Sequence, residues 1–224
     1  MNSPQITLPL RVWDLPVRLF HWSLVVLVVS LFVTGKLGGN WLEWHRRAGF
    51  SVIGLVLFRV LWGFVGSYHA RFANFLRGPK VVIAYAKAMI DGNAPKYIGH
   101  NPLGAVSVLT MLIVLLMQAV LGLFSNDDIM LEGPYARFIS KELSDQLTAL
   151  HKINADIILI LVGTHLVAIA FAYFYRKENL VLAMVSGNKW MAERETVENG
   201  QPPAWLAWVV GVCVASVTYL VLKF

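Results

Sequence analysis

The sequence predicts an all-α integral membrane protein with five membrane-spanning helices. Three observations lead to this fold class: 57% of the 224 residues are hydrophobic, only 14% are charged, and the mean hydropathy is +0.62. Soluble domains carry roughly 25% charged residues, so much of this surface must face lipid. These values exclude a soluble enzyme and give no support to a nucleic-acid-binding protein. The length leaves room for one membrane domain.

The first two spans are expected at residues 17–37 and 45–66. Pro16 suits the first turn of the first helix, whose uncharged core ends at Lys36. After Arg46 and Arg47 at its start, the second run is interrupted only by Arg59, which is near enough to its end to reach lipid headgroups or an anionic group. The first ten residues lack the basic start and apolar core of a cleaved signal, so we expect the first span to remain in the mature protein.

Three further uncharged runs predict the remaining spans. No Asp, Glu, Lys or Arg occurs in residues 97–126, which hold the third span, or in residues 157–175, which hold the fourth. Apolar residues at helical spacing extend the fourth helix backward to His151. The fifth run, near residues 204–222, follows two prolines and carries aromatic residues that fit interfacial belts.

The charges of the loops predict the orientation of the chain. Between the second and third spans they are mainly basic: Arg71, Arg77, Lys80, Lys87 and Lys96 against Asp91. Between the third and fourth spans they are mainly acidic: Asp127, Asp128, Glu132, Glu142 and Asp145 against Arg137 and Lys141. Because basic loops stay cytoplasmic, we expect a cytoplasmic N-terminus and a periplasmic C-terminus, although Arg46 and Arg47 in the short outer turn are exceptions. The acidic loop is either a docking surface for a basic partner protein or simply solvated.

Apolar residues at helical spacing also predict two helices within these loops. One follows Gly78 and Pro79, and its lysines can point to lipid headgroups. The other covers residues 138–150 on the acidic side.

Four histidines lie inside the hydrophobic runs or at their edges: His21, His45, His151 and His165. An imidazole in lipid needs a reason, and the simplest is a hydrogen bond to a neighbouring helix. However, His151 and His165 are 14 residues apart, which is close to four helical turns, so both leave the same face of the fourth span. About 21 Å separates them along the axis, so they belong to two different sites.

The directions of the spans predict a partner for each of these two histidines. The first span runs outward and carries His21 at its inner start, whereas the second runs inward and carries His45 at its outer start. The fourth span also runs inward, with His151 at the outer level and His165 deeper. We therefore expect His21 to pair with His165 and His45 with His151, although the depths match only coarsely.

Haem iron suits such pairs better than zinc does. Two imidazoles leave a tetrahedral zinc ion half ligated, and no Cys, Asp or Glu lies one turn away to complete the site. A porphyrin supplies four equatorial nitrogens itself and needs one histidine above and one below. Cys213 is the only cysteine, which excludes a covalently attached c-type haem and Cys-ligated clusters.

Other residues are weaker candidates for cofactor contacts. Gly49 and Gly163 lie near histidines, and small residues allow a flat ring or another helix to approach. Arg18 and Arg59 either pair with haem propionates or extend toward headgroups. Asp156 either orients a ligand histidine or carries protons, or it lies at the membrane interface. His69 and His100 are expected to be structural or solvated, with a quinone contact by His100 as the alternative.

Five motifs together resemble the bacterial cytochrome b561 and nickel-iron hydrogenase b-type cytochrome subunit family. They are VRLFHW at 17–22, EWH with Gly49 at 43–49, RVLWGFVGSYHARF at 59–72, GHNPLGA at 99–105 and LHKINADIILILVGTH at 150–165. The resemblance covers roughly residues 11–190.

The resemblance implies a four-helix haem-binding transmembrane bundle over residues 1–190. The linker and the fifth C-terminal transmembrane helix over 191–224, which the hydrophobic pattern predicts, have no counterpart in that four-helix core. The resemblance implies two b haems, held by the same four histidines, in the bacterial inner membrane. It also implies electron transfer between a quinone, ubiquinone or menaquinone, and a redox partner. Such partners include hydrogenases, other dehydrogenases and c-type cytochromes.

Two alternative functions remain open on the sequence. One is a self-sufficient oxidoreductase that takes electrons from superoxide and delivers them to quinone, which Arg46 and Arg47 beside His45 favour because cations attract that substrate. The other is a non-redox membrane anchor or transporter whose histidines carry protons or hold helices together.

Overall fold

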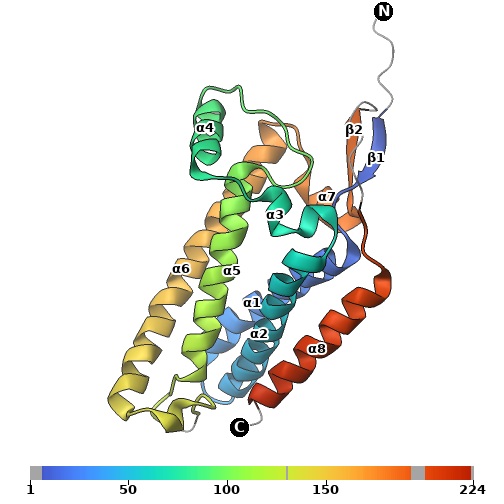
Figure 1. Cartoon of the computed structure of the whole chain (residues 1–224). Helices are drawn as coiled ribbons and strands as arrows, with labels where there is room; N and C mark the ends of the chain where they lie inside the picture. Colours follow the sequence, from blue (N-terminus) through green and yellow to red (C-terminus); the bar gives the residue numbers. More distant parts are fainter. Residues whose placement is uncertain (1–6, 130, 193–199, 223–224) are drawn as a thin grey trace, which may run out of the picture.

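The structure is a computed structural model of the chain, and it describes residues 7–129, 131–192 and 200–222. These residues are mostly helical, with one short antiparallel sheet. Four helices are long and apolar enough to cross a membrane: α1 (Leu15–Leu37), α2 (Trp41–Val65), α5 (Pro102–Leu123) and α6 (Lys141–Phe174). They form the elongated bundle of Figure 1 and alternate in direction. The predicted helical membrane class and these four spans are confirmed.

Shorter elements lie at the two ends of this bundle. One end carries η1 (Tyr68–Ala70), α3 (Phe72–Phe75), α4 (Pro79–Ile90), α7 (Leu180–Ser186) and the strands β1 (Thr7–Arg11) and β2 (Asn188–Ala192). The opposite end carries the loop before α6 with η2 (Ala136–Phe138). We call the first the inner end, because α1 begins there, and the second the outer end. The helix α4 confirms the predicted loop helix after Pro79.

The helix α6 is longer than the predicted fourth span. It runs without interruption for 34 residues, and the side chain of Ser140 caps its start by accepting a hydrogen bond from the Leu143 N–H. The separate helix predicted over residues 138–150 is therefore wrong in its boundaries, because from Lys141 onward it forms the first turns of α6. No proline and no glycine occurs in α6 before Gly163, so nothing in the local sequence ends the helix earlier.

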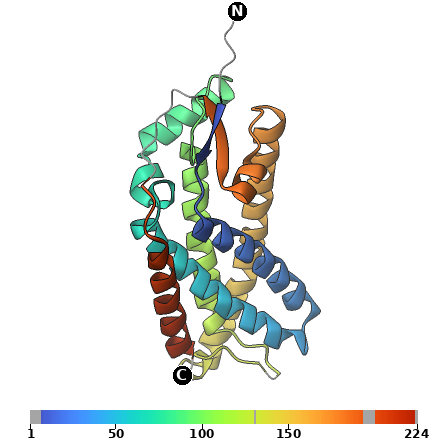
Figure 2. The same cartoon turned by 90° about the vertical axis from the view of Figure 1, so that its right-hand side faces the viewer.

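A fifth long helix, α8 (Ala204–Leu222), lies at the predicted position. It runs beside α2 from the inner end toward the outer end, as Figures 1 and 2 show. A Cβ built on Gly54 of α2 would lie 3.6 Å from Oγ1 of Thr218, so the two helices approach closely. The apolar part of α8 is shorter than that of the other four helices. Its crossing of the membrane therefore stays a prediction, and residues 193–199 of the predicted linker lie outside the described part.

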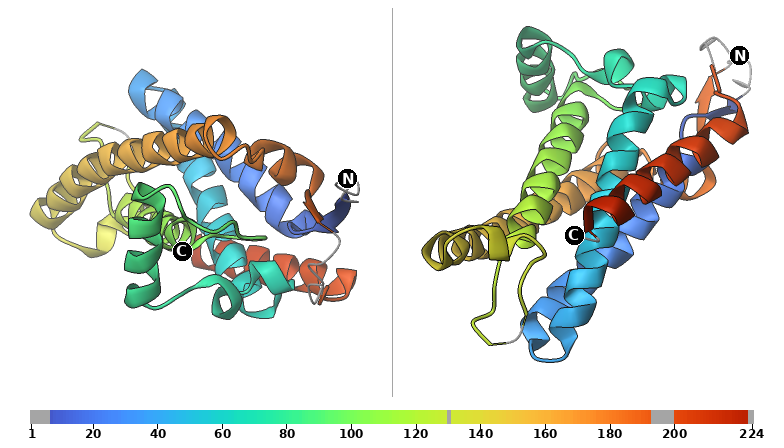
Figure 3. Two further views of the ribbon diagram at one scale, coloured as in Figure 1. Left: turned by 90° about the horizontal axis from the view of Figure 1, so that it is seen from above. Right: turned by 60° about the horizontal axis from the view of Figure 1, so that its bottom comes forward.

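The helices pack in a defined order. The helix α1 packs on α2, α2 on α5 and α8, and α5 on α6. A cluster of buried side chains from all four spans fills the middle of the bundle: Phe20, Val52, Val56, Leu112, Leu115 and Ile158. Among the described residues, α1 and α6 are not one of the closely packed helix pairs. Their crossing is visible from the inner end in Figure 3.

The antiparallel sheet at the inner end was not predicted. Strand β1 pairs with β2, with Arg11 opposite Asn188. Next to the sheet, the N–H groups of Val12 and Trp13 donate to the carbonyl of Gly187, at 2.9 and 3.0 Å. Gly187 ends α7 with φ +86°, a left-handed conformation that favours glycine. The two strands are far apart in the sequence and short, so no local pattern marked them, and residues 1–6 lie outside the described part.

Asp14 links the start of α1 to the end of α2. Its carboxylate accepts hydrogen bonds from the Val17 N–H at 2.7 Å and from Nε1 of Trp62 at 2.9 Å, and the residue is 3% exposed. Replacing Asp14 by alanine should cost about 2–4 kcal/mol, because a helix cap is lost and a buried indole N–H is left without an acceptor. Thermal unfolding in detergent measures this loss. Asp14→Asn keeps only one of the two oxygens that accept these bonds, so it should lose less than alanine without restoring the full stability, and equal losses would contradict the explanation.

Candidate functional site

The outer end brings together the two histidines predicted to pair there. His45 lies in the first turns of α2 and His151 lies in α6, and their ring centroids are 6.2 Å apart with an angle of 76° between the ring planes. Two imidazoles bound on opposite sides of one metal ion would have centroids roughly 6 Å apart, given metal–nitrogen bonds of about 2 Å. The separation therefore fits a pair of axial ligands.

The ring of His45 is held by the helix α1. Its Nδ1 lies 2.9 Å from the backbone carbonyl oxygen of Leu31 and 3.4 Å from Oγ1 of Thr34. A Cβ built on Gly35, one turn after Leu31, would lie only 3.1 Å from Cε1 and Nδ1 of the ring. The glycine therefore leaves room for the imidazole to reach the carbonyl.

The ring of His151 is held in the same way by α5. Its Nδ1 lies 3.0 Å from the backbone carbonyl oxygen of Gln118. A Cβ on Gly122, again one turn further along, would lie 3.1 Å from Cε1 of the ring. In addition, the side-chain Nε2 of Gln118 lies 3.1 Å from Nε2 of His151, and its Oε1 accepts a hydrogen bond from the buried Asn154 at 2.8 Å.

These contacts fix the protonation pattern of both rings. A backbone carbonyl can only accept, so each Nδ1 carries the proton and each Nε2 keeps its lone pair for a metal. Within the part of the chain that the structure describes, no three His, Cys, Asp or Glu side chains converge as a metal site would require. The donor set thus fits a metal that arrives with its own equatorial ligands, as haem iron does. Coordination of a metal by Nε2 of His151 would require the side-chain amide of Gln118 to move away from this nitrogen.

The inner end places the other predicted pair within electrostatic range. His21 of α1 and His165 of α6 are close enough to influence each other electrostatically, and Nδ1 of His21 is buried without a hydrogen-bond partner. Both side chains are half-buried. A histidine of α6 thus lies near a histidine of another helix at each end, but the inner imidazole of His21 lacks the carbonyl contact that both outer rings have.

Arg59 lies inside the protein at this inner level. It is 3% exposed, its guanidinium carbon lies 5.2 Å from the centroid of the Phe72 ring, and its Nη1 has no hydrogen-bond partner. Of the two interpretations of the sequence, an arginine that extends toward headgroups is therefore wrong. A buried guanidinium with an unpartnered Nη1 fits a carboxylate such as a haem propionate.

The remaining sequence candidates have different surroundings. Arg18 donates from Nη2 to the carbonyl of Val185, and its buried Nε has no partner. A Cβ on Gly49 or on Gly163 would meet nothing within 4 Å, so neither glycine serves a close contact between described helices. Asp156 is exposed, and the carbonyl of Gln118 rather than this carboxylate orients His151. The proposed orienting role of Asp156 is therefore wrong.

His69 and His100 were expected to be structural or solvated, and their surroundings fit the structural role. His69 is 9% exposed, with Nε2 unpartnered, and the ring of His100 lies 4.6 Å from those of both Trp13 and Phe75. Burial, assisted by the positive charge of Arg59, lowers the pKa of His100 to about 3, so this imidazole is neutral at pH 7. Burial also lowers the pKa of His69. The apolar residues around both histidines were the feature of the sequence that could have indicated this burial.

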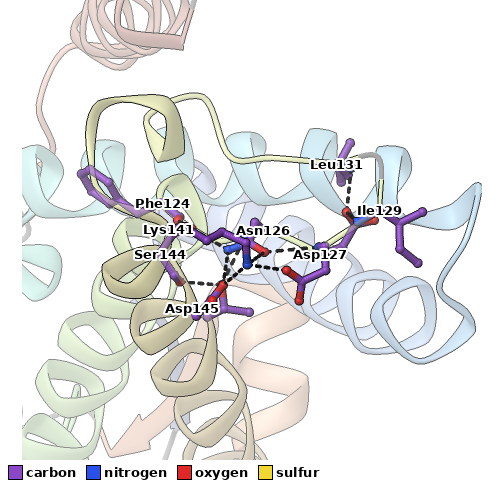
Figure 4. Close-up of polar contacts among 10 residues, drawn as sticks. Phe124, Asn126, Asp127, Ile129, Leu131, Lys141, Ser144 and Asp145 are labelled. Carbon is purple, nitrogen blue, oxygen red and sulfur yellow. Dashed lines mark hydrogen bonds and ion pairs between the residues drawn. The ribbon is translucent and has the colours of Figure 1, made fainter.

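The acidic loop at the outer end is folded by its own charges. Figure 4 shows the amide of Asn126 between the hydroxyl of Ser144, at 2.7 Å, and the carboxylate of Asp145, at 2.9 Å. Lys141 pairs with Asp145 and with Asp128. Part of the acidic charge that was considered for docking is thus already paired within the loop.

Comparison with known proteins agrees with this geometry. The family model described as prokaryotic cytochrome b561 matches residues 12–187. A probable Ni/Fe-hydrogenase B-type cytochrome subunit of Azotobacter vinelandii is 31% identical over 46% of this chain and 53% of its own length. A protein of the same name from Rhizobium leguminosarum bv. viciae is 24% identical over 82% of this chain and 90% of its own length.

The chain therefore spans about half the length of the Azotobacter relative that it matches. No solved structure matches it. The family match, in contrast, covers most of the chain and includes all four histidines of the two pairs. By this match, by its four apolar helices and by the facing histidines, the chain belongs to the prokaryotic cytochrome b561 family.

Proposed function

We propose that this protein is a dihaem b-type cytochrome that carries electrons across the bacterial inner membrane. The observation that supports this most is that one helix, α6, offers a histidine to each end of the bundle. At the outer end the ring centroid of His151 lies 6.2 Å from that of His45, and at the inner end His165 is within electrostatic range of His21. Family membership implies haem b as the cofactor. A bound haem b supplies a one-electron iron couple.

In this proposal four histidines would hold the two haems. His45 and His151 hold the outer haem, and His21 and His165 hold the inner haem. Arg59 and Arg18 offer guanidinium groups to the inner propionates. With two histidines to hold each haem, oxygen binding would be disfavoured and electron transfer favoured. The buried side chains between the two levels, about 21 Å apart on α6, keep water out of the path.

The partners follow from the ends of the bundle and from the names of the relatives. We propose a quinone, ubiquinone or menaquinone, on one side and a protein redox partner on the other. Relatives named as hydrogenase cytochrome subunits favour a hydrogenase or another dehydrogenase, and a periplasmic c-type cytochrome is the further candidate.

We further propose that α8 crosses the membrane as a fifth span outside the haem-binding domain of residues 1–190. Its 19 residues make a helix of about 28 Å, close to the thickness of the hydrocarbon core. With the basic loops inside, the N-terminus is cytoplasmic and the C-terminus periplasmic.

The superoxide-oxidising alternative is less well supported. Arg46 and Arg47 were expected to attract an anionic substrate, but both form ion pairs with Glu43, at 2.7 Å each. Their charges are thus partly compensated. Stopped-flow consumption of superoxide with equivalent reduction of quinone would favour that alternative over a conduit. The non-redox anchor or transporter would be favoured by a colourless preparation.

The test of the proposed function is the haem content of the purified protein. Pyridine haemochrome quantification should give two b haems per chain, and the reduced-minus-oxidised spectrum should show six-coordinate, low-spin b haem. A quinol should reduce both. One haem per chain, or none, would overturn the dihaem assignment.

A further inference from the structure

We infer that the inner histidine pair gives its iron a higher affinity for an electron than the outer pair does. The inference rests on the proposed function and concerns how the chain makes its two ends unequal. The contacts of the histidines and the placement of buried charge both differ between the ends, and both differences act in the same direction.

At the outer end, both ligand histidines donate to backbone carbonyls. Nδ1 of His45 contacts the carbonyl of Leu31 at 2.9 Å, and Nδ1 of His151 contacts that of Gln118 at 3.0 Å. An acceptor on Nδ1 makes an imidazole a more basic ligand. A more basic ligand stabilises the oxidised iron, so this end should have the lower midpoint potential.

Cations near the outer pair do not offset this effect. Arg46 and Arg47 are paired with Glu43 and are partly exposed, with 36% and 61% of their side-chain surfaces accessible. Lys152, next to His151, is exposed as well. Water and the carboxylate screen these charges.

At the inner end, the buried charge is positive. Arg59 follows His45 on the same face of α2 by 14 residues, the spacing that also separates His151 from His165 on α6. The guanidinium therefore lies at the level of the inner pair, where it interacts with His100, which in turn interacts with His165. A buried positive charge is poorly screened and favours the arrival of an electron.

Two further observations at the inner end agree with a higher midpoint potential there. Nδ1 of His21 is buried with no acceptor, so His21 lacks the contact that would make it more basic. The nearby anion, Asp14, interacts with Arg59 but already receives hydrogen bonds from the Val17 N–H and the Trp62 indole. Arg18 adds a second cation at the same end. The transfer of one electron from the outer to the inner site is therefore favourable: one iron is oxidised, the other is reduced, and no proton or bond is required.

Potentiometric titration of the purified protein in lipid nanodiscs tests this order. The His45→Ala variant should retain only the inner haem and His21→Ala only the outer haem, so each midpoint is assigned separately. The midpoint potential of the inner haem should be higher than that of the outer haem by at least 59 mV. For one electron, this difference corresponds to a tenfold preference for the inner site. Equal midpoints, or a higher outer one, would overturn the inference while leaving the dihaem assignment intact. A protein with fewer than two haems would overturn both.

Arg59→Gln separates the contribution of the buried charge. It should lower the midpoint of the inner component and leave the outer component unchanged, whereas Arg59→Lys, which keeps the charge, should shift it much less. Haem content and the difference spectrum verify that both variants are loaded. A variant Arg59→Gln with an unchanged inner midpoint would exclude Arg59 as the cause. If Arg59→Gln does not assemble, the two histidine variants still decide the order.

Discussion

Replacing His45 by alanine is expected to remove one of two haems and to leave the other in place. The same loss of one haem is expected for His151→Ala, because both imidazoles lie at the outer end with ring centroids 6.2 Å apart. Conversely, His21→Ala and His165→Ala should remove the inner haem only. At a site built around two histidines, the loss of one removes a bond to the iron, so that haem should be held less firmly. The measurement is the haemochrome ratio, which should fall from two to one in each variant.

The decisive evidence comes from combining these variants. His45→Ala with His151→Ala should still hold one haem, since both changes affect the same site, whereas His45→Ala with His165→Ala should hold none. His69→Gln is the matched control, because it replaces a buried histidine that is not among the proposed ligands. If the double variant His45→Ala with His165→Ala retained one haem, His45 and His165 would belong to the same site, which would contradict the ligand assignment.

The second large effect is expected at Gly122, which lies against the ring of His151. A Cβ there would be 3.1 Å from Cε1 and 3.5 Å from Nδ1, so the ring must shift away from the carbonyl of Gln118. Such overpacking costs about 1–3 kcal/mol, and Gly122→Ala should therefore weaken outer haem binding about tenfold or more. The rate of haem transfer to an excess of a competing haem-binding protein measures this loss.

Gly211→Ala in α8 provides the control for helix propensity. Alanine gains helix stability over glycine at both positions, but a Cβ on Gly211 meets nothing within 4 Å. Only Gly122→Ala should lose haem, and Gly35→Ala should behave like it because its Cβ would press on His45. If both Gly122→Ala and Gly35→Ala retained their haems, the glycines would not be needed for the rings to reach their carbonyls.

Much of the bundle could be predicted because membrane spans and helical periodicity are local properties of the sequence. The spacing of His151 and His165 predicted two sites on one face of α6, and the directions of the spans predicted the partners that the structure places near each of them. These inferences need only the period of a helix and the alternation of spans.

The supporting contacts could not be predicted in the same way. The acceptors for His45 and His151 are backbone carbonyls, which every residue has, so no residue type marks Leu31 or Gln118. The burial of Arg59 depends on η1 and α3 folding over the end of α2, with Phe72 against the guanidinium. One feature of the sequence could have predicted that Arg59 lies at the inner level. It follows His45 by the same number of residues by which His165 follows His151.

The pairing of β1 with β2 has a consequence for the biosynthesis of the chain. Strand β1 precedes α1, whereas β2 follows α7, so the ribosome must deliver every span of the four-helix bundle before the two strands can meet. Contacts between such distant segments form late, because a long loop must first close. Sheet formation should therefore coincide with completion of the bundle during membrane insertion, and the strand before α1 has to wait unpaired on its side of the membrane until then.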